Sequence, residues 1–192
     1  MRNSYAIVTS LLTCLLSFNA QASKFDVSVE HPYGLPNPDA PVELAQFAFM
    51  IGQNDCSESR RDRTSGEWVV SNRTWDAHYV LNGYGIYDTG GSGNVTNGNM
   101  RIFDEAKGMW HVTFFASPSY SSGTWSGQKE GERIVLRKPQ IAPVNNIPGY
   151  STLTFSNISD KGFHWSGEWA SEDGKITYPF WTISCKKRVG PR

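Results

Sequence analysis

The chain has 192 residues, and its 18 Lys or Arg residues balance 18 Asp or Glu residues, so the formal net charge is zero. This balance argues against a nucleic-acid-binding protein, because binding the phosphate backbone requires a basic excess. With 39% hydrophobic and 19% charged residues in a length typical of one domain, the composition also excludes a disordered chain.

Residues 1–22 have the pattern of a secretory signal peptide that is removed from the mature protein. Arg2 supplies a positive charge, residues 6–18 form an apolar run, and the small residues Ala20 and Ala22 follow. The apolar run is shorter than the about 20 residues that a transmembrane helix needs. We therefore predict cleavage near Ala22, a periplasmic or secreted protein, and no stable membrane insertion.

The mature chain is expected to contain a disulfide bond. Cleavage would remove Cys14 and leave Cys56 and Cys185, which lie near the two ends of the mature domain. Two thiols in an oxidising compartment favour a disulfide, which here would join the first strand to the last. A pair of buried free thiols is the alternative.

A proline-rich N-terminal arm is predicted over residues 23–46. Four prolines fall within residues 31–46, and no alternating pattern is present there. The arm is expected to end in a short helical turn from Pro41 to Phe49, because Asp39 and Pro41 are typical of the start of a helix.

Beyond residue 55 the chain alternates between apolar and polar residues, with turn-forming Gly, Asn and Asp between the segments. Short connections of this kind join antiparallel neighbours, and a meander of this length closes most simply as a barrel. The predicted fold is all-β: an antiparallel up-and-down barrel of about 9–10 strands over residues 47–188, followed by a tail over residues 189–192. The glycine-rich segment 90–98 is expected to be a flexible loop at the barrel mouth. The candidate strands are 55–62, 67–81, 84–89, 99–104, 109–116, 121–127, 132–138, 151–158, 162–170 and 178–187.

Strand alternation also predicts which side chains share a face. The aromatic residues fall on one face of their strands, which we expect to point into the barrel. The opposite face carries His78, His111, His164 and Glu168, whose direction would reverse if the lumen were polar. Because no two of these histidines have a spacing that brings them to one ion, we predict no metal site and no cofactor.

Five segments carry a family resemblance. They are Phe47–Gly52, Trp75–Asp88, Arg101–Asp104, Gly108–Trp110 and Phe163–Trp181. In this order they resemble a lipocalin-like (calycin) β-barrel domain family of mostly uncharacterised bacterial proteins. The resemblance implies an up-and-down barrel with a cavity but no established activity, since a fold alone does not determine function. Where that family has Trp two positions after the first Gly, this chain has Asn54, so the base of the barrel must pack differently.

The leading hypothesis is that the barrel binds a small hydrophobic or aromatic molecule in an aromatic-lined cavity. Arg101 shares a strand face with Phe103, so an inward Arg101 could orient a polar group of the ligand. An ion pair with an inward acid is the alternative role for Arg101, and Arg73 has the same ambiguity. The expected ligand-binding residues are Trp75, Tyr79, Arg101, Trp110, Trp125, Trp165 and Trp181.

Two other functions stay open. The barrel could be a cofactor-free enzyme, an isomerase, cyclase or lyase acting on a small aromatic compound, with Glu168 or Asp76 as an acid–base group if they point inward. The proline-rich arm could instead serve as an interaction module, and a homodimer is a further option. No nucleophile elbow, phosphate loop or dinucleotide fingerprint is present, so the identity of any catalytic residue stays unknown at this point.

Overall fold

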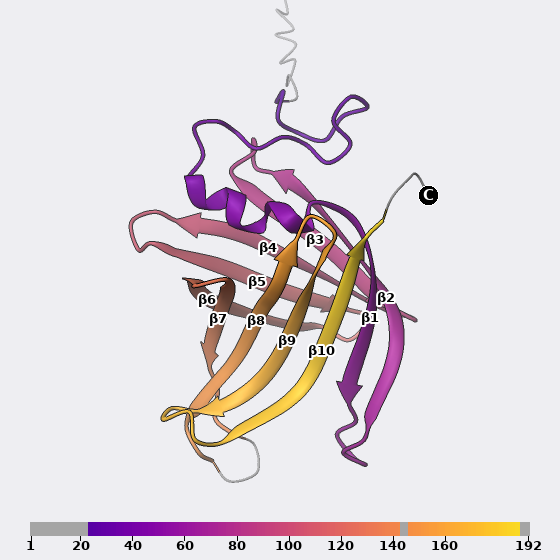
Figure 1. Ribbon diagram of the computed structural model, residues 1–192, viewed down its shortest axis with the longest axis vertical. Helices are drawn as coiled ribbons and strands as arrows, with labels where there is room; N and C mark the ends of the chain where they lie inside the picture. The colour runs from indigo at the N-terminus through magenta and orange to yellow at the C-terminus, as the bar shows by residue number, and fades with distance from the viewer. Residues whose placement is uncertain (1–22, 143–145, 189–192) are drawn as a thin grey trace, which may run out of the picture.

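The computed structural model describes residues 23–142 and 146–188. The predicted signal peptide, residues 1–22, and the predicted tail, residues 189–192, lie outside the described residues. One 3₁₀ helix, η1, precedes ten strands (Figure 1). No helix in the described ranges is both long and apolar enough to cross a membrane. The bounds are η1 Val42–Met50, β1 Gly52–Arg61, β2 Trp68–Val80, β3 Gly85–Ser92, β4 Val95–Asp104, β5 Met109–Ser117, β6 Ser121–Glu130, β7 Arg133–Pro139, β8 Gly149–Ser159, β9 Gly162–Ser171 and β10 Thr177–Lys187.

The ten strands form one closed, antiparallel, up-and-down barrel, which confirms the predicted fold class. Each strand pairs with its neighbours along the chain, and β10 pairs with β1 to close the sheet. Buried and half-buried residues alternate from Arg73 to Val80 in β2 and from Phe163 to Ser171 in β9. This period of two is expected for strands that turn one face to a barrel interior.

The prediction of a flexible loop over residues 90–98 is wrong. Only the two-residue turn Gly93–Asn94 separates β3 from β4. Gly90 reflects close packing, since a Cβ atom at this position would overlap the guanidinium of Arg73. Glycine inside a strand often marks such a close approach to the backbone.

Helix η1 covers one end of the barrel, which we call the plugged end (Figure 1). Its apolar side chains Leu44, Phe47 and Met50 are buried. The Phe47 ring packs edge-on against Trp110, with ring centroids 4.8 Å apart, and against Phe155, at 5.2 Å. The helix therefore inserts an aromatic side chain into the barrel and fills that end.

Two polar side chains fasten the C-terminal end of η1 to the barrel. Asn54 Nδ2 donates to the carbonyl oxygens of Met50, at 2.9 Å, and Trp75, at 2.8 Å. Lys187 Nζ donates to the carbonyl oxygen of Phe49 at 3.1 Å. The bonds to Met50 and Phe49 satisfy carbonyl groups at the end of η1 that have no partner within the helix. A hydrogen-bonded amide thus stands where the resembled family has an aromatic ring.

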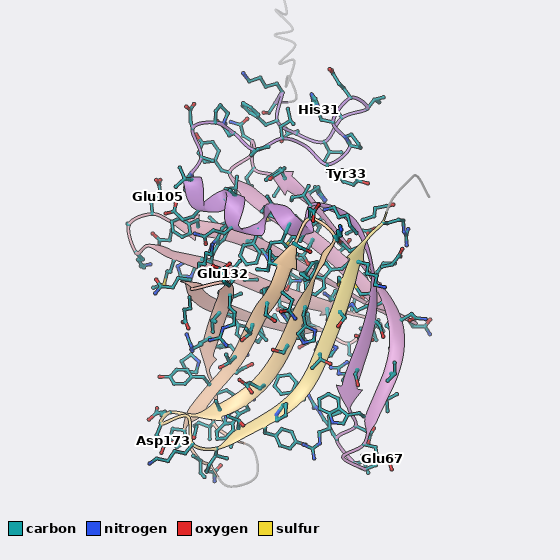
Figure 2. The ribbon with its side chains drawn as sticks, viewed as in Figure 1. His31, Tyr33, Glu67, Glu105, Glu132 and Asp173 are labelled. Carbon is teal, nitrogen blue, oxygen red and sulfur yellow. A yellow bond between two sulfur atoms is a disulfide. The ribbon has the colours of Figure 1, made fainter. Side chains whose placement is uncertain are left out.

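The proline-rich arm packs against the same end of the barrel, where Figure 2 shows Tyr33. The backbone N–H of Tyr79 donates to the carbonyl of Tyr33 at 2.9 Å, and that of Asn37 donates to the carbonyl of Gly83 at 3.1 Å.

The predicted boundary between the arm and the barrel, at residue 47, falls inside η1, because this helix begins at Val42.

The predicted disulfide bond is confirmed. Cys56 in β1 and Cys185 in β10 are joined with an S–S distance of 2.03 Å. The two cysteines are direct partners in the register of these strands. The bond therefore crosses the seam at which the barrel closes.

Candidate functional site

The half of the inner face next to η1, the plugged half, is a packed aromatic core. Trp75, Trp110, Phe155 and Phe163 are each at most 4% exposed. The Trp75 ring lies 6.0 Å from Phe155 and 5.5 Å from Phe163 between ring centroids. Trp110 Nε1 donates to Gln46 Oε1 of η1 at 3.1 Å. Two of the predicted ligand-binding tryptophans, Trp75 and Trp110, are thus buried against other side chains of the chain.

Arg101 also lies in the plugged half. Its side chain is 2% exposed and forms an ion pair with Asp88. The guanidinium carbon is 5.1 Å from the centre of the Phe47 ring and 5.7 Å from that of Phe155. Burial lowers the pKa of Arg101 to about 9, so the guanidinium stays charged at neutral pH. Of the two predicted roles, the structure shows the ion pair with an inward acid.

The partner of Arg101, Asp88, is absent from the sequence predictions. Its Oδ1 accepts hydrogen bonds from Trp75 Nε1, at 2.7 Å, and from Asn99 Nδ2, at 2.8 Å. A charge in a protein interior is tolerated when it is paired and hydrogen-bonded in this way. The alternation from buried Ile86 to Asp88 along β3 was the signal that could have placed this acid on the inner face.

The half of the inner face farthest from η1, the distal half, carries aromatic side chains that are only half-buried. Trp125, Trp181 and Phe114 belong to this group. The Trp181 ring lies edge-on to buried Trp165, with centroids 5.2 Å apart, and Phe114 lies 6.3 Å from Trp125. Solvent therefore reaches aromatic rings on the inner face at this end. Of the predicted ligand-binding residues, Trp125, Trp165 and Trp181 lie here, and Tyr79 lies toward the plugged end.

The orientation of these indole rings is set within the chain. Trp125 Nε1 donates to Ser151 Oγ at 3.1 Å. A Cβ atom on Gly123 would lie 3.0 Å from the Trp125 ring, and one on Gly167 would lie 3.0 Å from the Trp165 ring. Because glycine leaves room for the rings and the Trp125 N–H is already bonded, the aromatic wall is organised without a ligand.

Glu58 is the centre of a polar cluster in the distal half that the sequence predictions missed. Its Oε1 accepts from Ser71 Oγ at 2.8 Å. Its Oε2 accepts from Arg73 Nη1 at 3.2 Å and from Trp181 Nε1 at 3.0 Å. Arg73 Nη2 in turn donates to Asn97 Oδ1 at 2.8 Å. Arg73 is therefore an inward, ion-paired residue.

The environment of Glu58 favours its charged form. Burial alone would raise the pKa of this carboxyl group, but the hydrogen bond from Ser71, the charge and hydrogen bond of Arg73, and the hydrogen bond from Trp181 outweigh burial. The pKa is consequently below its ordinary value. The Trp181 ring is held by the same carboxylate.

His78, His111, His164 and Glu168 lie on the outer face of the barrel. His111 Nδ1 is 2.8 Å from Ser126 Oγ, and His164 Nδ1 is 3.0 Å from Ser184 Oγ. The His78 ring lies against the outer Tyr87 ring, and burial lowers the pKa of His78. Across residues 23–142 and 146–188, no group of three or more His, Cys, Asp or Glu residues is placed to hold a metal ion.

No protein-family model and no curated protein matches this chain. The lipocalin-like resemblance therefore stays a prediction, whereas the barrel is established by the strand pairing itself. Any function must be argued from the geometry of the chain.

A Ser–His–Asp arrangement crosses the outer face of β6, β5 and β4. Ser126 Oγ contacts His111 Nδ1, and His111 Nε2 lies 3.5 Å from Asp104 Oδ2. Catalysis by such a group also requires free N–H donors that stabilise an oxyanion. Ser126 is paired with neighbouring strands on both sides, so its surrounding backbone donors are used in the sheet. The arrangement is consistent with a surface hydrogen-bond network.

Two hollows lie away from the aromatic wall of the distal half. One, of about 890 Å³, is lined mainly by outward-facing residues of β10, β1, β2 and β3, including Ser57, Asn72 and Lys186. The other, of about 320 Å³, lies beside η1 and includes Gln46 and Phe103. Neither hollow is lined by a tryptophan, so neither matches the predicted aromatic-lined site.

Proposed function

We propose that this protein binds a small aromatic or hydrophobic molecule on the inner face of the distal half of its barrel, against Trp125, Trp181 and Phe114. The observation that carries the proposal is the contrast between the two halves. Trp75, Trp110, Phe155 and Phe163 are buried in the plugged half, whereas Trp125, Trp181 and Phe114 in the distal half are only half-buried. Large apolar side chains that only stabilise a fold are normally buried, and a group of exposed rings is typical of a binding surface.

Exposed apolar side chains around the same end support the proposal. They occupy the strand ends and turns of the distal end, where Figure 2 labels Glu67 and Asp173. A ligand with an apolar surface would meet these side chains before it reached the inner face. These residues are Trp68, Val95, Tyr120, Ile176 and Tyr178.

The proposed site is narrower than the set of residues predicted from the sequence. Trp125 and Trp181 form the accessible wall of the proposed site, and buried Trp165 packs edge-on against the Trp181 ring. Trp75, Tyr79, Trp110 and Arg101 form the packed base of the barrel and do not contact the ligand in this proposal. The preorganised indoles would bind a planar group through ring stacking, which favours offset or edge-on arrangements.

We also propose that the protein functions in the periplasm or outside the cell. The Cys56–Cys185 disulfide supports this location, because such bonds persist in oxidising compartments. The signal-like pattern of residues 1–22 is in agreement with it.

Titration with N-phenyl-1-naphthylamine, a neutral dye whose fluorescence rises in apolar surroundings, tests the binding proposal. We expect saturable binding at one site per chain. Trp125→Ala should weaken it by about tenfold or more, because stacking and apolar contact are lost. Tyr84→Ala removes an exposed aromatic ring in the β2–β3 turn of the plugged end and is the matched control, with dye affinity expected to change by less than about threefold.

Absence of saturable dye binding, or equal loss in both variants, would contradict the proposal. Native mass spectrometry of protein purified from its own host provides the complementary measurement. An adduct that dissociates on denaturation would give the mass of the natural ligand.

A further inference from the structure

The inner face of the distal half has an excess of positive charge. By strand register, Arg60 in β1, Arg73 in β2 and Lys138 in β7 fall on the same inner face as Trp181 and Trp125. Within the described ranges, Glu58 is the carboxylate that shares this part of the inner face. Three cationic groups therefore face one anionic group.

Glu58 neutralises only one of these cations. Both of its oxygens are occupied, by Ser71, Arg73 and Trp181, and its ion pair is with Arg73 at 3.2 Å. Arg60 and Lys138 form no ion pair with any carboxylate in the described part of the chain. Two positive charges on the inner face are thus left without a counter-charge.

Each of these two cations lies against a ring of the proposed site. Lys138 Nζ is 4.3 Å from the centre of the Trp125 ring, and the Arg60 guanidinium carbon is 4.5 Å from the centre of the Trp181 ring. Cation–π contacts hold such groups beside an aromatic face. Both cations still have N–H donors, and a carboxylate or sulfonate is the strongest acceptor for them.

We infer that the ligand is an aromatic acid, a planar apolar group with an anionic substituent, whose ring packs on Trp125 and Trp181 while its anion is bound by Lys138 and Arg60. This inference rests on the proposed binding function and specifies its ligand class. A neutral ligand would displace water from the half-buried Lys138 without supplying a counter-charge, although opposite charges attract more strongly in such surroundings than in bulk water. An anionic ligand supplies that counter-charge.

A matched pair of dyes separates charge from apolar contact. 8-Anilinonaphthalene-1-sulfonate has the same fused-ring and anilino groups as N-phenyl-1-naphthylamine but adds a sulfonate. At low ionic strength we expect the sulfonate dye to bind at least about tenfold more tightly, with one site per chain. The advantage should shrink as salt is added, because ions screen the attraction.

Substitution of the unpaired cations locates the anion. Lys138→Met keeps most of the side-chain volume and removes the charge, so affinity for the sulfonate dye should fall by about fivefold or more while that for the neutral dye is kept. Arg60→Met should act in the same direction. Lys161→Met, at an exposed turn of the plugged end, is the control and should change neither affinity.

Equal affinity for the two dyes, or unchanged sulfonate binding in both Lys138→Met and Arg60→Met, would overturn the inference while leaving the proposed function intact. Failure of both dyes to bind would instead overturn the proposed function. Far- and near-ultraviolet circular dichroism of each variant should match that of the parent protein, which excludes dye binding to a partly unfolded chain.

Discussion

Each half of the inner face contains one buried ion pair, and the two pairs have different surroundings. Arg101 and Asp88 are enclosed by the rings of the plugged half. Arg73 and Glu58 lie in the distal half, where Glu58 also binds Ser71 and the proposed ligand-contacting Trp181. Removing one partner of a buried pair leaves an uncompensated charge, which costs more than the pair contributes. Glu58 therefore links the stability of the fold to the position of a site residue.

Glu58→Gln should lower the free energy of unfolding by about 3–5 kcal/mol at pH 7, because Arg73 loses its counter-charge. The pKa of Glu58 in the folded state is below the ordinary value of 4.5, so its contribution is present above that pH and is lost as the pH falls through the folded-state pKa. The difference between parent and variant should therefore shrink below pH 4.5. Urea unfolding followed by tryptophan fluorescence measures this at each pH.

Glu67→Gln, an exposed carboxylate in the β1–β2 turn, is the matched control for this experiment. It should change the free energy of unfolding by less than about 0.5 kcal/mol. A stability difference for Glu58→Gln that stays constant down to pH 3 would show that the Arg73 ion pair does not carry the effect.

At the level of elements, η1 determines which end of the barrel is filled. Phe47 enters the lumen between Trp110 and Phe155, and Asn54 and Lys187 hold the end of the helix to β1 and β10. The helix is short and of the 3₁₀ type, so its stability must come from packing and not from its own hydrogen bonds.

Phe47→Ala should destabilise the protein by about 3–5 kcal/mol, since it leaves a cavity beside the buried rings of Trp110 and Phe155. Val42→Ala, in the same helix but 84% exposed, should have an effect below about 0.5 kcal/mol. Chemical denaturation of both variants provides the comparison. Similar stability losses in the two would mean that η1 acts only as a surface segment.

At the level of the whole molecule, closure of the barrel leaves none of the ten described strands with a free edge. An open sheet of ten strands would expose two edges that can pair with other chains, and the β1–β10 pairing removes both. The Cys56–Cys185 bond spans 129 residues of sequence and fixes this seam covalently. The disulfide thus connects the first and last strands of the barrel.

Replacing both cysteines, as Cys56→Ala with Cys185→Ala, should lower the free energy of unfolding by about 2–5 kcal/mol, mainly because the unfolded chain gains freedom. The parent protein in excess dithiothreitol should show a similar loss, and the variant should not respond to the reductant. Protein exported by its host should begin at Ser23 and have the mass of the oxidised chain. Free thiols in exported protein would contradict this.

Strand positions and faces could be predicted from the sequence because the side-chain period of a strand is local. Alternation alone placed Trp75 and Trp165 inward and His111 and His164 outward, as the structure shows. The disulfide followed from the number of cysteines left after signal cleavage. Asp88 and Glu58 obey the same alternation, but which cation each acid meets depends on strand register, which the alternation does not specify.

Only the tertiary structure decided which aromatic side chains are packed and which remain accessible. Trp110 and Trp125 have the same inward pattern in sequence, yet the rings of η1 cover the first and not the second. Likewise, the sequence around Gly90 predicts a loop. In the structure Gly90 lies in β3, where the Arg73 side chain leaves no room for a Cβ atom. Burial depends on contacts between segments far apart in the chain, and a local pattern carries no information about those contacts.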